Sequence, residues 1–478
     1  MADSVPGPRP DQPKPLPIRA GLGGLRRGFE ALGVRNYRLY WSGQVVSLIG
    51  TWMQQVSLPW LVLALGGTPI QLGIVTALEF APAMLLAPFG GVFADRVDKR
   101  HVLIGAQVAS AAQALLLFVL TAGGVIDIWM VMLLGLWRGL VNAAEMPTRQ
   151  ALAADLVPRR QLANAIALNS MAFNSARVVG PAVAGVIIAI GTASTGSAIS
   201  GVAANFAINT VTFAAVLAAL LMMNPAEIRR VASPERHPPV LHSLREGFAY
   251  AWRTPLVLWC LVLLGGVATF GYNFQILLPL YTDDVLHIGA AGYGALYAAM
   301  GVGSLAGSMT LAFMRRRPAV PLMVIGGVAF SVLLAGMVVA SAPLPAALLV
   351  LGVGYFSMLM VNTINATVQA NVADALRGRV MSLYVTVFAG SAPIGGIFAG
   401  AVAEAWGTPP AFLIGAIFSL LTVLGVALAL RRAARRGPLG VTMLDSDPVK
   451  EPVRAPSRPR APRRLPEDGP PATSSSPS

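Results

Sequence analysis

The sequence is poor in charge and in cysteine. Only 12% of its 478 residues are Asp, Glu, Lys or Arg, roughly half the share that soluble proteins carry. In contrast, 55% of the residues are apolar, and runs such as 102–123 and 411–430 are long enough to cross a bilayer, which takes about 20 residues in a helix. The one cysteine, Cys260, lies within an apolar run, so a disulfide framework is excluded. This composition places the chain in a membrane.

Signatures of enzymes and of ATP-driven pumps are missing as well. The sequence has no Gly-x-x-x-x-Gly-Lys-Ser/Thr loop, the signature of a phosphate-binding NTPase site. The four histidines are scattered without the spacing of metal ligands, and no nucleophile stands beside a base. We therefore expect a protein that is not an enzyme and that uses no cofactor and no metal. The first 30 residues lack an apolar segment, which predicts that no signal peptide is cleaved.

Breaks rich in charge, Pro or Gly divide the apolar sequence into twelve predicted helices. Their ranges are 39–65, 71–93, 102–124, 128–146, 166–190, 200–223, 255–279, 290–313, 320–341, 345–369, 380–404 and 411–430. The predicted organisation is a disordered cytoplasmic arm over 1–38, six-helix bundles over 39–223 and 255–430, a cytoplasmic linker over 224–254 and a disordered basic tail over 431–478. Within the linker, 241–253 is amphipathic, and we expect it on the inner membrane face.

The basic residues predict the orientation of these helices. With the N-terminus inside, all 35 Lys and Arg residues lie in inner loops or terminal segments except Arg138 and Arg177, which fall within predicted helices. The outer loops carry Asp127, Asp283 and Asp284 instead. Because basic residues accumulate on the cytoplasmic side, both termini are predicted to be cytoplasmic. The net charge of +14 then indicates contact with anionic lipid headgroups, and no nucleic-acid partner is expected.

The two predicted halves resemble each other along the chain. The segment LANAIALNS (162–170) aligns with RGRVMSLYV (377–385), and QVSLP (55–59) aligns with QILLP (275–279). Each match is short, but the matches follow the same order in both halves. Two six-helix halves of like topology around a site at the membrane midplane are typical of secondary transporters.

The stretch GGVFADRVDKR (90–100) concentrates charge in a chain that has little of it. It resembles the motif between helices 2 and 3 of the major facilitator superfamily, Gly-x-Leu-Ala-Asp-Arg-x-Gly-Arg-Lys, except that Asp98 replaces the second Gly. The resemblance implies a gating motif formed by Gly91, Asp95, Arg96, Lys99 and Arg100.

The equivalent loop of the second half keeps Gly307 and the basic run but has Leu311 where the acid would be. We therefore expect Asp95 to pair across the interface between the halves, with Arg379 or with the positive dipole end of helix 11. The alternative is a local pair of Asp95 with a neighbouring basic residue, which contributes little in water.

Two further motifs resemble proton-coupled exporters of that superfamily. Helix 4 has Leu134-x-x-x-Arg138, with Asn142 where the motif has Gly, and helix 5 has an antiporter-like motif, Gly180-Pro181-Ala182-Val183-Ala184-Gly185. Together with 36–63 and 146–158, these residues resemble the enterobactin-exporter and macrolide-efflux branch of drug:proton antiporters. The resemblance covers 35–430 and implies an all-α integral membrane protein with twelve transmembrane helices in two six-helix halves, the major facilitator fold.

Ionisable side chains within the predicted helices are candidates for proton coupling, because charge is costly in hydrocarbon. Glu79 lies among apolar and small residues near the middle of helix 2, and we expect it to bind a proton. The alternatives are a pair with a neighbouring helix and a carboxylate that faces water in the cavity. Arg138 is the expected partner of Glu79, unless it binds an anionic substrate or holds a structural salt bridge. Glu145 is a third candidate, which an i,i+4 pair with Arg149 would equally explain. Arg177 is expected to snorkel toward the inner surface.

A substrate pocket should be apolar and aromatic with a few polar groups. The residues of that kind at the expected depth are Trp52, Gln55, Asn174, Tyr272, Asn273, Gln275 and Tyr297. Each of them would serve equally well to pack one helix against another.

These features and the resemblance together predict a secondary active transporter that works by alternating access. We expect it to export a small amphipathic molecule, drug-like or siderophore-like, in exchange for protons, as a monomer in the plasma (inner) membrane. An importer of a small solute on the same fold is one alternative, and a non-transporting membrane receptor is another. The helix 5 motif favours export, and Glu79 and Arg138 favour transport over a passive scaffold.

Overall fold

The computed structural model describes residues 28–96, 98–228, 240–314 and 320–436; the side chains of 87–96, 240–244, 374, 375 and 436 lie outside that description. Throughout these ranges the regular structure is helical. The predicted all-α class is therefore confirmed. The long helices of the first half are α2 (Arg35–Ala64), α3 (Pro69–Arg96), α4 (Lys99–Ala122), α5 (Ile128–Asp155), α6 (Leu162–Thr195) and α7 (Ala198–Met222).

The second half begins with the amphipathic helix of the linker, α8 (Val240–Arg253), at the position where the sequence predicts it. The helices that follow are α9 (Pro255–Gly271), α10 (Phe274–Asp284), α11 (Gly289–Phe313), α12 (Val320–Gly336), α13 (Pro343–Asn371), α14 (Asp374–Trp406) and α15 (Thr408–Arg436). In the described ranges, nine helical segments are long and apolar enough to cross a membrane, and α12 is a shorter apolar helix. The count of twelve spans stays a prediction.

Several helix boundaries differ from the sequence-based expectation, and two of the differences are the largest. The helix predicted over 255–279 is broken into α9 and α10, because the side chain of Asn273 donates hydrogen bonds to the backbone oxygens of Thr269, at 2.9 Å, and Phe270, at 3.3 Å. These bonds satisfy carbonyl groups that the end of a helix leaves open. In contrast, α5 continues through Pro147 to Asp155, although the sequence predicted its end near 146.

The start of α4 explains the residue by which the charged loop departs from the family motif. Asp98 is the N-cap of α4, and its Oδ1 accepts hydrogen bonds from the backbone nitrogens of Arg100, at 3.0 Å, and His101, at 3.3 Å. An Asp side chain at this position satisfies backbone donors that would otherwise lack a partner. The substitution therefore gives the loop a defined helix start in place of a flexible Gly.

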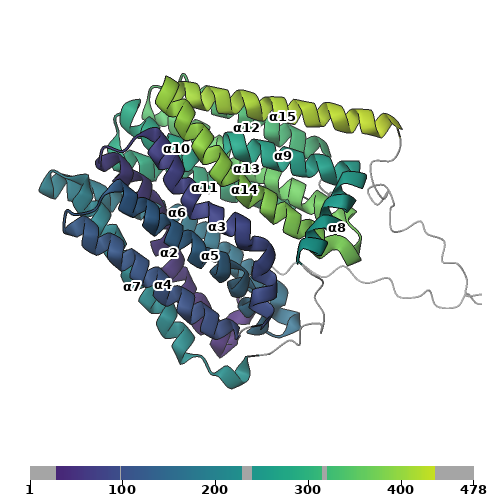
Figure 1. The fold of residues 1–478 in the computed structure, drawn as a ribbon, viewed down its shortest axis with the longest axis horizontal. Helices are drawn as coiled ribbons and strands as arrows, with labels where there is room; N and C mark the ends of the chain where they lie inside the picture. Colours follow the sequence, from purple (N-terminus) through teal and green to yellow (C-terminus); the bar gives the residue numbers. More distant parts are fainter. Residues whose placement is uncertain (1–27, 97, 229–239, 315–319, 437–478) are drawn as a thin grey trace, which may run out of the picture. The chain divides into compact units, whose positions relative to one another are not determined.

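The first and second halves meet mainly through two pairs of helices, α3 with α14 and α6 with α11 (Figure 1). Glycines allow the backbones to approach closely, since a Cβ atom on Gly73 of α3 would lie only 2.4 Å from the backbone oxygen of Gly396 in α14. At the same end of this pair, the backbone nitrogen of Ile70 donates to Oε2 of Glu404 at 2.9 Å. The halves are therefore in close contact at the end where α3 begins and α14 ends.

Candidate functional site

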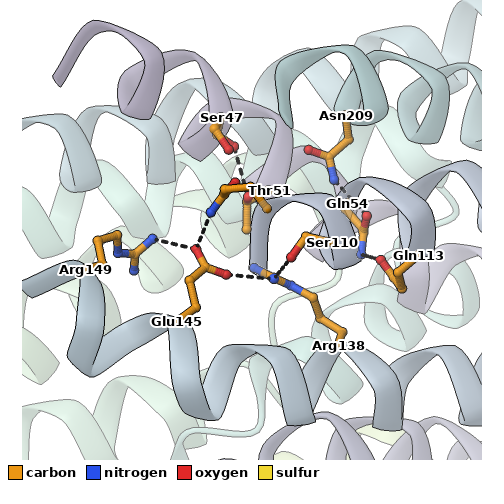
Figure 2. Close-up of polar contacts among 10 residues, drawn as sticks. Ser47, Thr51, Gln54, Ser110, Gln113, Arg138, Glu145, Arg149 and Asn209 are labelled. Carbon is orange, nitrogen blue, oxygen red and sulfur yellow. Dashed lines mark hydrogen bonds and ion pairs between the residues drawn. The ribbon is translucent and has the colours of Figure 1, made fainter. Parts of the chain in front are cut away.

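A buried ion cluster lies between α4 and α5. Its centre is Glu145, which is 2% exposed. Oε2 of Glu145 lies 3.1 Å from Nη1 of Arg138, and Oε1 lies 3.5 Å from Nη1 of Arg149 (Figure 2). Oε1 also accepts a hydrogen bond from Nε2 of Gln107 at 3.0 Å. Arg138 also donates to Oγ of Ser110 at 2.7 Å. One carboxylate thus lies between two guanidinium groups and receives a hydrogen bond on each oxygen.

The ion cluster shows which residues pair with Glu145 and Arg138, two of the predicted candidates for proton coupling. The i,i+4 pair of Glu145 with Arg149 is confirmed. Arg138, however, forms its ion pair with Glu145 and not with Glu79. Arg138 and Glu145 share a face of α5, because seven residues are close to two helical turns. Where α3 contacts α5, at Gly139, the nearest atom of Glu79 is its backbone oxygen and not its carboxyl group.

Glu79 contrasts with Glu145. Its side chain is partly buried and makes no hydrogen bond or ion pair with the described part of the chain. Arg138 and Tyr297 lie within electrostatic range of its carboxyl group. Of the two acids, Glu79 is therefore the one whose charge is not already balanced by a direct contact.

Side-chain amides join three helices beside the ion cluster. Nε2 of Gln54 donates to Oε1 of Gln113 at 3.1 Å, and Nδ2 of Asn209 donates to Oε1 of Gln54 at 2.7 Å (Figure 2). All three side chains are buried, and they connect α2, α4 and α7. Buried polar groups that are satisfied in this way fix the relative positions of the helices. The network therefore holds α2, α4 and α7 together beside the ion cluster, and its amide groups are already hydrogen-bonded to one another.

A second candidate site lies where α2 and α6 of the first half meet α11 of the second. Trp52 and Tyr297 have ring centroids 6.3 Å apart, and Trp52 contacts Phe173 edge-on at 5.5 Å. The Cζ atom of Arg177 lies 5.8 Å from the ring centroid of Trp52. The side chain of Gln275 at the start of α10 lies near Tyr297. Three of the predicted pocket residues, Trp52, Gln275 and Tyr297, are thus brought together.

Arg177 lies 15 residues into α6, about 22 Å along the axis from the helix start at 1.5 Å per residue. Its snorkelling toward the inner surface stays a prediction. Its Nε is buried without a hydrogen-bond partner.

The other predicted pocket residues make local contacts. Nδ2 of Asn174 donates to the backbone oxygen of Ser170 within its own helix at 2.8 Å, and Asn273 stabilises the break between α9 and α10. Gln55 is partly buried and forms no hydrogen bond with described residues. Tyr272 donates its hydroxyl to the backbone oxygen of Ser357 at 3.1 Å. A role of these residues in substrate binding stays a prediction.

The antiporter-like motif packs against two different helices. A Cβ atom on Gly180 would lie 2.5 Å from Cβ of Trp52 in α2, whereas one on Gly185 would lie 2.9 Å from the backbone oxygen of Ala290 in α11. The backbone oxygen of Pro181 faces Gly294 of α11 in the same way. The motif therefore forms part of the interface between the halves and leaves no room for larger side chains.

The described members of the predicted gating motif bind within the first half. Nζ of Lys99 lies 2.6 Å from Oδ2 of Asp155, and Nε of Arg100 donates to the backbone oxygen of Leu220 at 2.9 Å near the C-terminus of α7. Arg379 forms an ion pair with Glu246 of α8. The side chains of Gly91, Asp95 and Arg96 lie outside the described residues, so the predicted contact of Asp95 with Arg379 stays a prediction.

Sequence reasoning missed the polar residues of α4 that complete the ion cluster. Gln107, Ser110 and Gln113 are spaced three residues apart in an otherwise apolar helix. That spacing puts the three side chains on one face of the helix. A polar face in an apolar helix is a signal in the sequence that could have indicated a buried polar contact.

The helical membrane fold, with its buried ion cluster and the interface between two halves, is that of a transporter of the major facilitator superfamily. The chain belongs to this superfamily, because the model of the transmembrane secretion effector family matches residues 27–454. The chain is 26% identical to the staphyloferrin A transporter of Staphylococcus aureus over 388 residues, covering 80% of this chain and 93% of that protein. It is 26% identical to an enterobactin exporter of Escherichia coli over 423 residues, covering 86% and 96%.

Another relative and two solved structures agree with this assignment. Macrolide efflux protein A of Streptococcus pyogenes is 28% identical over 245 residues, which cover 51% of this chain and 58% of that protein. A nucleoside transporter structure aligns with a TM-score of 0.66 at 14% identity over 82% of this chain and 99% of that one. A D-xylose–proton symporter structure aligns with a TM-score of 0.63 at 13% identity over 81% and 97%. The protein is thus a multi-pass membrane transporter of a small molecule, not an enzyme, and the solved structures support the fold alone.

Proposed function

We propose that the protein is a proton-coupled exporter of a small amphipathic molecule. The relatives named for staphyloferrin A, enterobactin and macrolides support a siderophore-like or drug-like substrate and movement out of the cell. The antiporter-like motif at the interface of α6 and α11 supports export by exchange. Under this proposal the protein resides in the plasma (inner) membrane, and the distribution of Lys and Arg supports cytoplasmic termini.

The proposed mechanism is alternating access between two bundles, 39–223 and 255–430, joined by the 224–254 linker. Close contacts at Gly73 with Gly396 and at Gly185 with Ala290 support a state in which the outer end is closed. Rocking of one bundle against the other would release these contacts and open that end.

The observation that carries the proton-coupling proposal is the contrast between the two buried acids. Glu145 is held by Arg138, Arg149 and Gln107, which stabilise its charged form, whereas Glu79 has no such contact. A carboxyl group that exchanges protons during a cycle must exist in both forms. We therefore assign the proton to Glu79, which has Arg138 as a nearby positive charge.

The test is transport in proteoliposomes under an imposed pH gradient, with radiolabelled erythromycin and enterobactin as probes. We expect the wild type to move one or both probes, Glu79→Gln to abolish the gradient-driven component, and the exposed control Glu227→Gln to leave it unchanged. Gradient-driven transport that survives Glu79→Gln would reject the proton site. If neither probe moves in either direction, a non-transporting receptor is favoured.

A further inference from the structure

Arg177 is a partly buried arginine without an ion pair in the part of the chain that the structure describes. Its Nε is buried and has no hydrogen-bond partner. Its Cζ lies 5.8 Å from the centroid of the Trp52 ring. An arginine side chain stays charged at any physiological pH. Withdrawing part of this charge from water is costly unless something pairs with it.

Arg138, the arginine of the ion cluster in α5, is an example of a structural arginine whose charge is paired within the chain. Arg138 is 8% exposed, and its guanidinium group contacts both the Glu145 carboxylate and the Ser110 hydroxyl. Arg177 has no equivalent of either. The difference indicates that the counter-charge of Arg177 is supplied from outside the chain.

The surroundings of Arg177 come from both halves of the protein. Trp52 belongs to α2, and Tyr297 of α11 lies across the interface, within electrostatic range of the guanidinium group. The side chain of Gln275, the second residue of α10, lies near Tyr297. The start of α10 therefore adds the positive end of a helix dipole to this region. A ligand held here would contact both bundles, as alternating access requires.

We infer that Arg177, flanked by Trp52 and Tyr297, binds the anionic group of the transported molecule. This inference deepens the proposed function and rests on it: the substrate class becomes an amphipathic organic acid with a carboxylate beside a flat apolar portion. The carboxylate pairs with the guanidinium fork, and the apolar portion packs against the two aromatic rings.

The experiment measures binding to the purified full-length protein in detergent by isothermal titration calorimetry. The probes are 2-naphthoate and its neutral amide, 2-naphthamide, which differ in charge and have nearly the same shape. We expect the wild type to bind the carboxylate about tenfold to a hundredfold more tightly, as a charge-assisted hydrogen bond allows. Arg177→Gln should remove this preference, and Arg253→Gln, which removes an exposed arginine of α8, should keep it.

A second replacement covers the case in which Arg177→Gln does not fold. Arg177→Met keeps a long side chain against Trp52 and removes the unpaired charge, so we expect it to fold and to lose the preference as well. A wild type that shows no preference for the carboxylate, or a preference that survives in either Arg177 variant, would overturn the inference. Because this assay needs no vesicle and no pH gradient, binding that depends on Arg177 together with absent transport would reject the proposed function instead.

Discussion

Arg138 and Glu145, seven residues apart on α5, form a buried ion pair with 3.1 Å between Nη1 and Oε2. Both side chains face α4, where Gln107 and Ser110 complete their hydrogen bonds. Removing water from two charges is expensive, so such a pair stabilises the fold only when its geometry and its hydrogen bonds are good. Here each carboxylate oxygen has a donor, and the pair fixes the register of α4 against α5.

Glu145→Gln should therefore destabilise the protein strongly. The variant leaves Arg138 and Arg149 near each other without a counter-charge, and breaking a buried pair in this way costs about 3–5 kcal/mol of unfolding free energy. Denaturant unfolding in detergent measures the loss.

The matched control for this prediction is the double variant Arg138→Met with Glu145→Met. It removes both members of the pair, so we expect it to recover a large part of the loss. A double variant less stable than Glu145→Gln would contradict the interpretation that the single change acts through an uncompensated charge.

Gly185→Leu should block the approach of α6 to α11. A side chain there would collide with the backbone of Ala290 and Gly294, and neither can move aside as a flexible side chain could. Overpacking of this kind costs about 1–3 kcal/mol, which lowers the equilibrium constant for closure by about fivefold to 160-fold. Transport should fall accordingly while insertion into the membrane is unchanged.

The control for this prediction is Gly105→Leu, because a Cβ atom on Gly105 of α4 would meet no atom within 4 Å. The measurement combines a transport assay with the labelling of a cysteine introduced at Ala291 by a membrane-impermeant maleimide. The native Cys260 is fully buried and should not interfere. Unchanged transport and labelling in Gly185→Leu would show that the contact is not needed for closure.

Residues whose role follows from local pattern could be predicted from the sequence. Apolar runs and their breaks predicted where the helices lie, and the i,i+4 spacing predicted the contact of Glu145 with Arg149. These features depend on near neighbours along the chain, which a sequence displays directly. The small residues of the antiporter-like motif likewise indicated close packing, although not which helices they would touch.

Residues whose role depends on a partner far along the chain could not be predicted. The surroundings of Arg177 are one example, because nothing nearby in the sequence indicates Tyr297, 120 residues later, as a residue close to it. The break between α9 and α10 was missed for a different reason. The Gly271-Tyr272-Asn273 segment is a helix-stop signal, but it lies within a run apolar enough to read as one continuous span.

Asp98 should stabilise the protein in a manner that depends on pH. Partial desolvation raises the pKa of its carboxyl group, but the hydrogen bonds from His101 and Arg100 and the charge of His101 outweigh it, so the pKa lies below its ordinary value. A carboxyl group with a lowered pKa contributes its stability above the unfolded pKa of about 3.9 and loses it as the pH falls through the folded value. Asp98→Ala should cost about 0.5–2 kcal/mol at pH 7.

Denaturant unfolding of Asp98→Ala from pH 7 down to about pH 3 measures this effect, and the difference from the wild type should shrink as Asp98 becomes protonated. Asp98→Asn keeps a side-chain acceptor without the charge, so its stability relative to Asp98→Ala should not change over the same range. A difference between wild type and Asp98→Ala that stays constant with pH would mean that the carboxylate is not the group responsible.

Arg379 has two competing partners, which charge reversal can separate. The structure pairs it with Glu246 of the linker helix α8, and the side chains are 31% and 38% exposed, respectively. The sequence predicts a second contact, with Asp95, when the inner end closes. Arg379→Glu should lower transport in either case, because it places like charges together. The decisive measurement is the transport rate of two reversed pairs, Arg379→Glu with Glu246→Arg and Arg379→Glu with Asp95→Arg.

If the linker contact is the important one, the pair with Glu246→Arg restores transport and the pair with Asp95→Arg does not. The recovery should correspond to about 1 kcal/mol or less, since partly exposed ion pairs are weak. If Asp95 is the partner during closure, the pair with Asp95→Arg restores transport instead, and the contact with Glu246 only positions α8 against α14. If neither reversed pair recovers any transport, an ion pair of Arg379 with Glu246 or with Asp95 is not needed for gating.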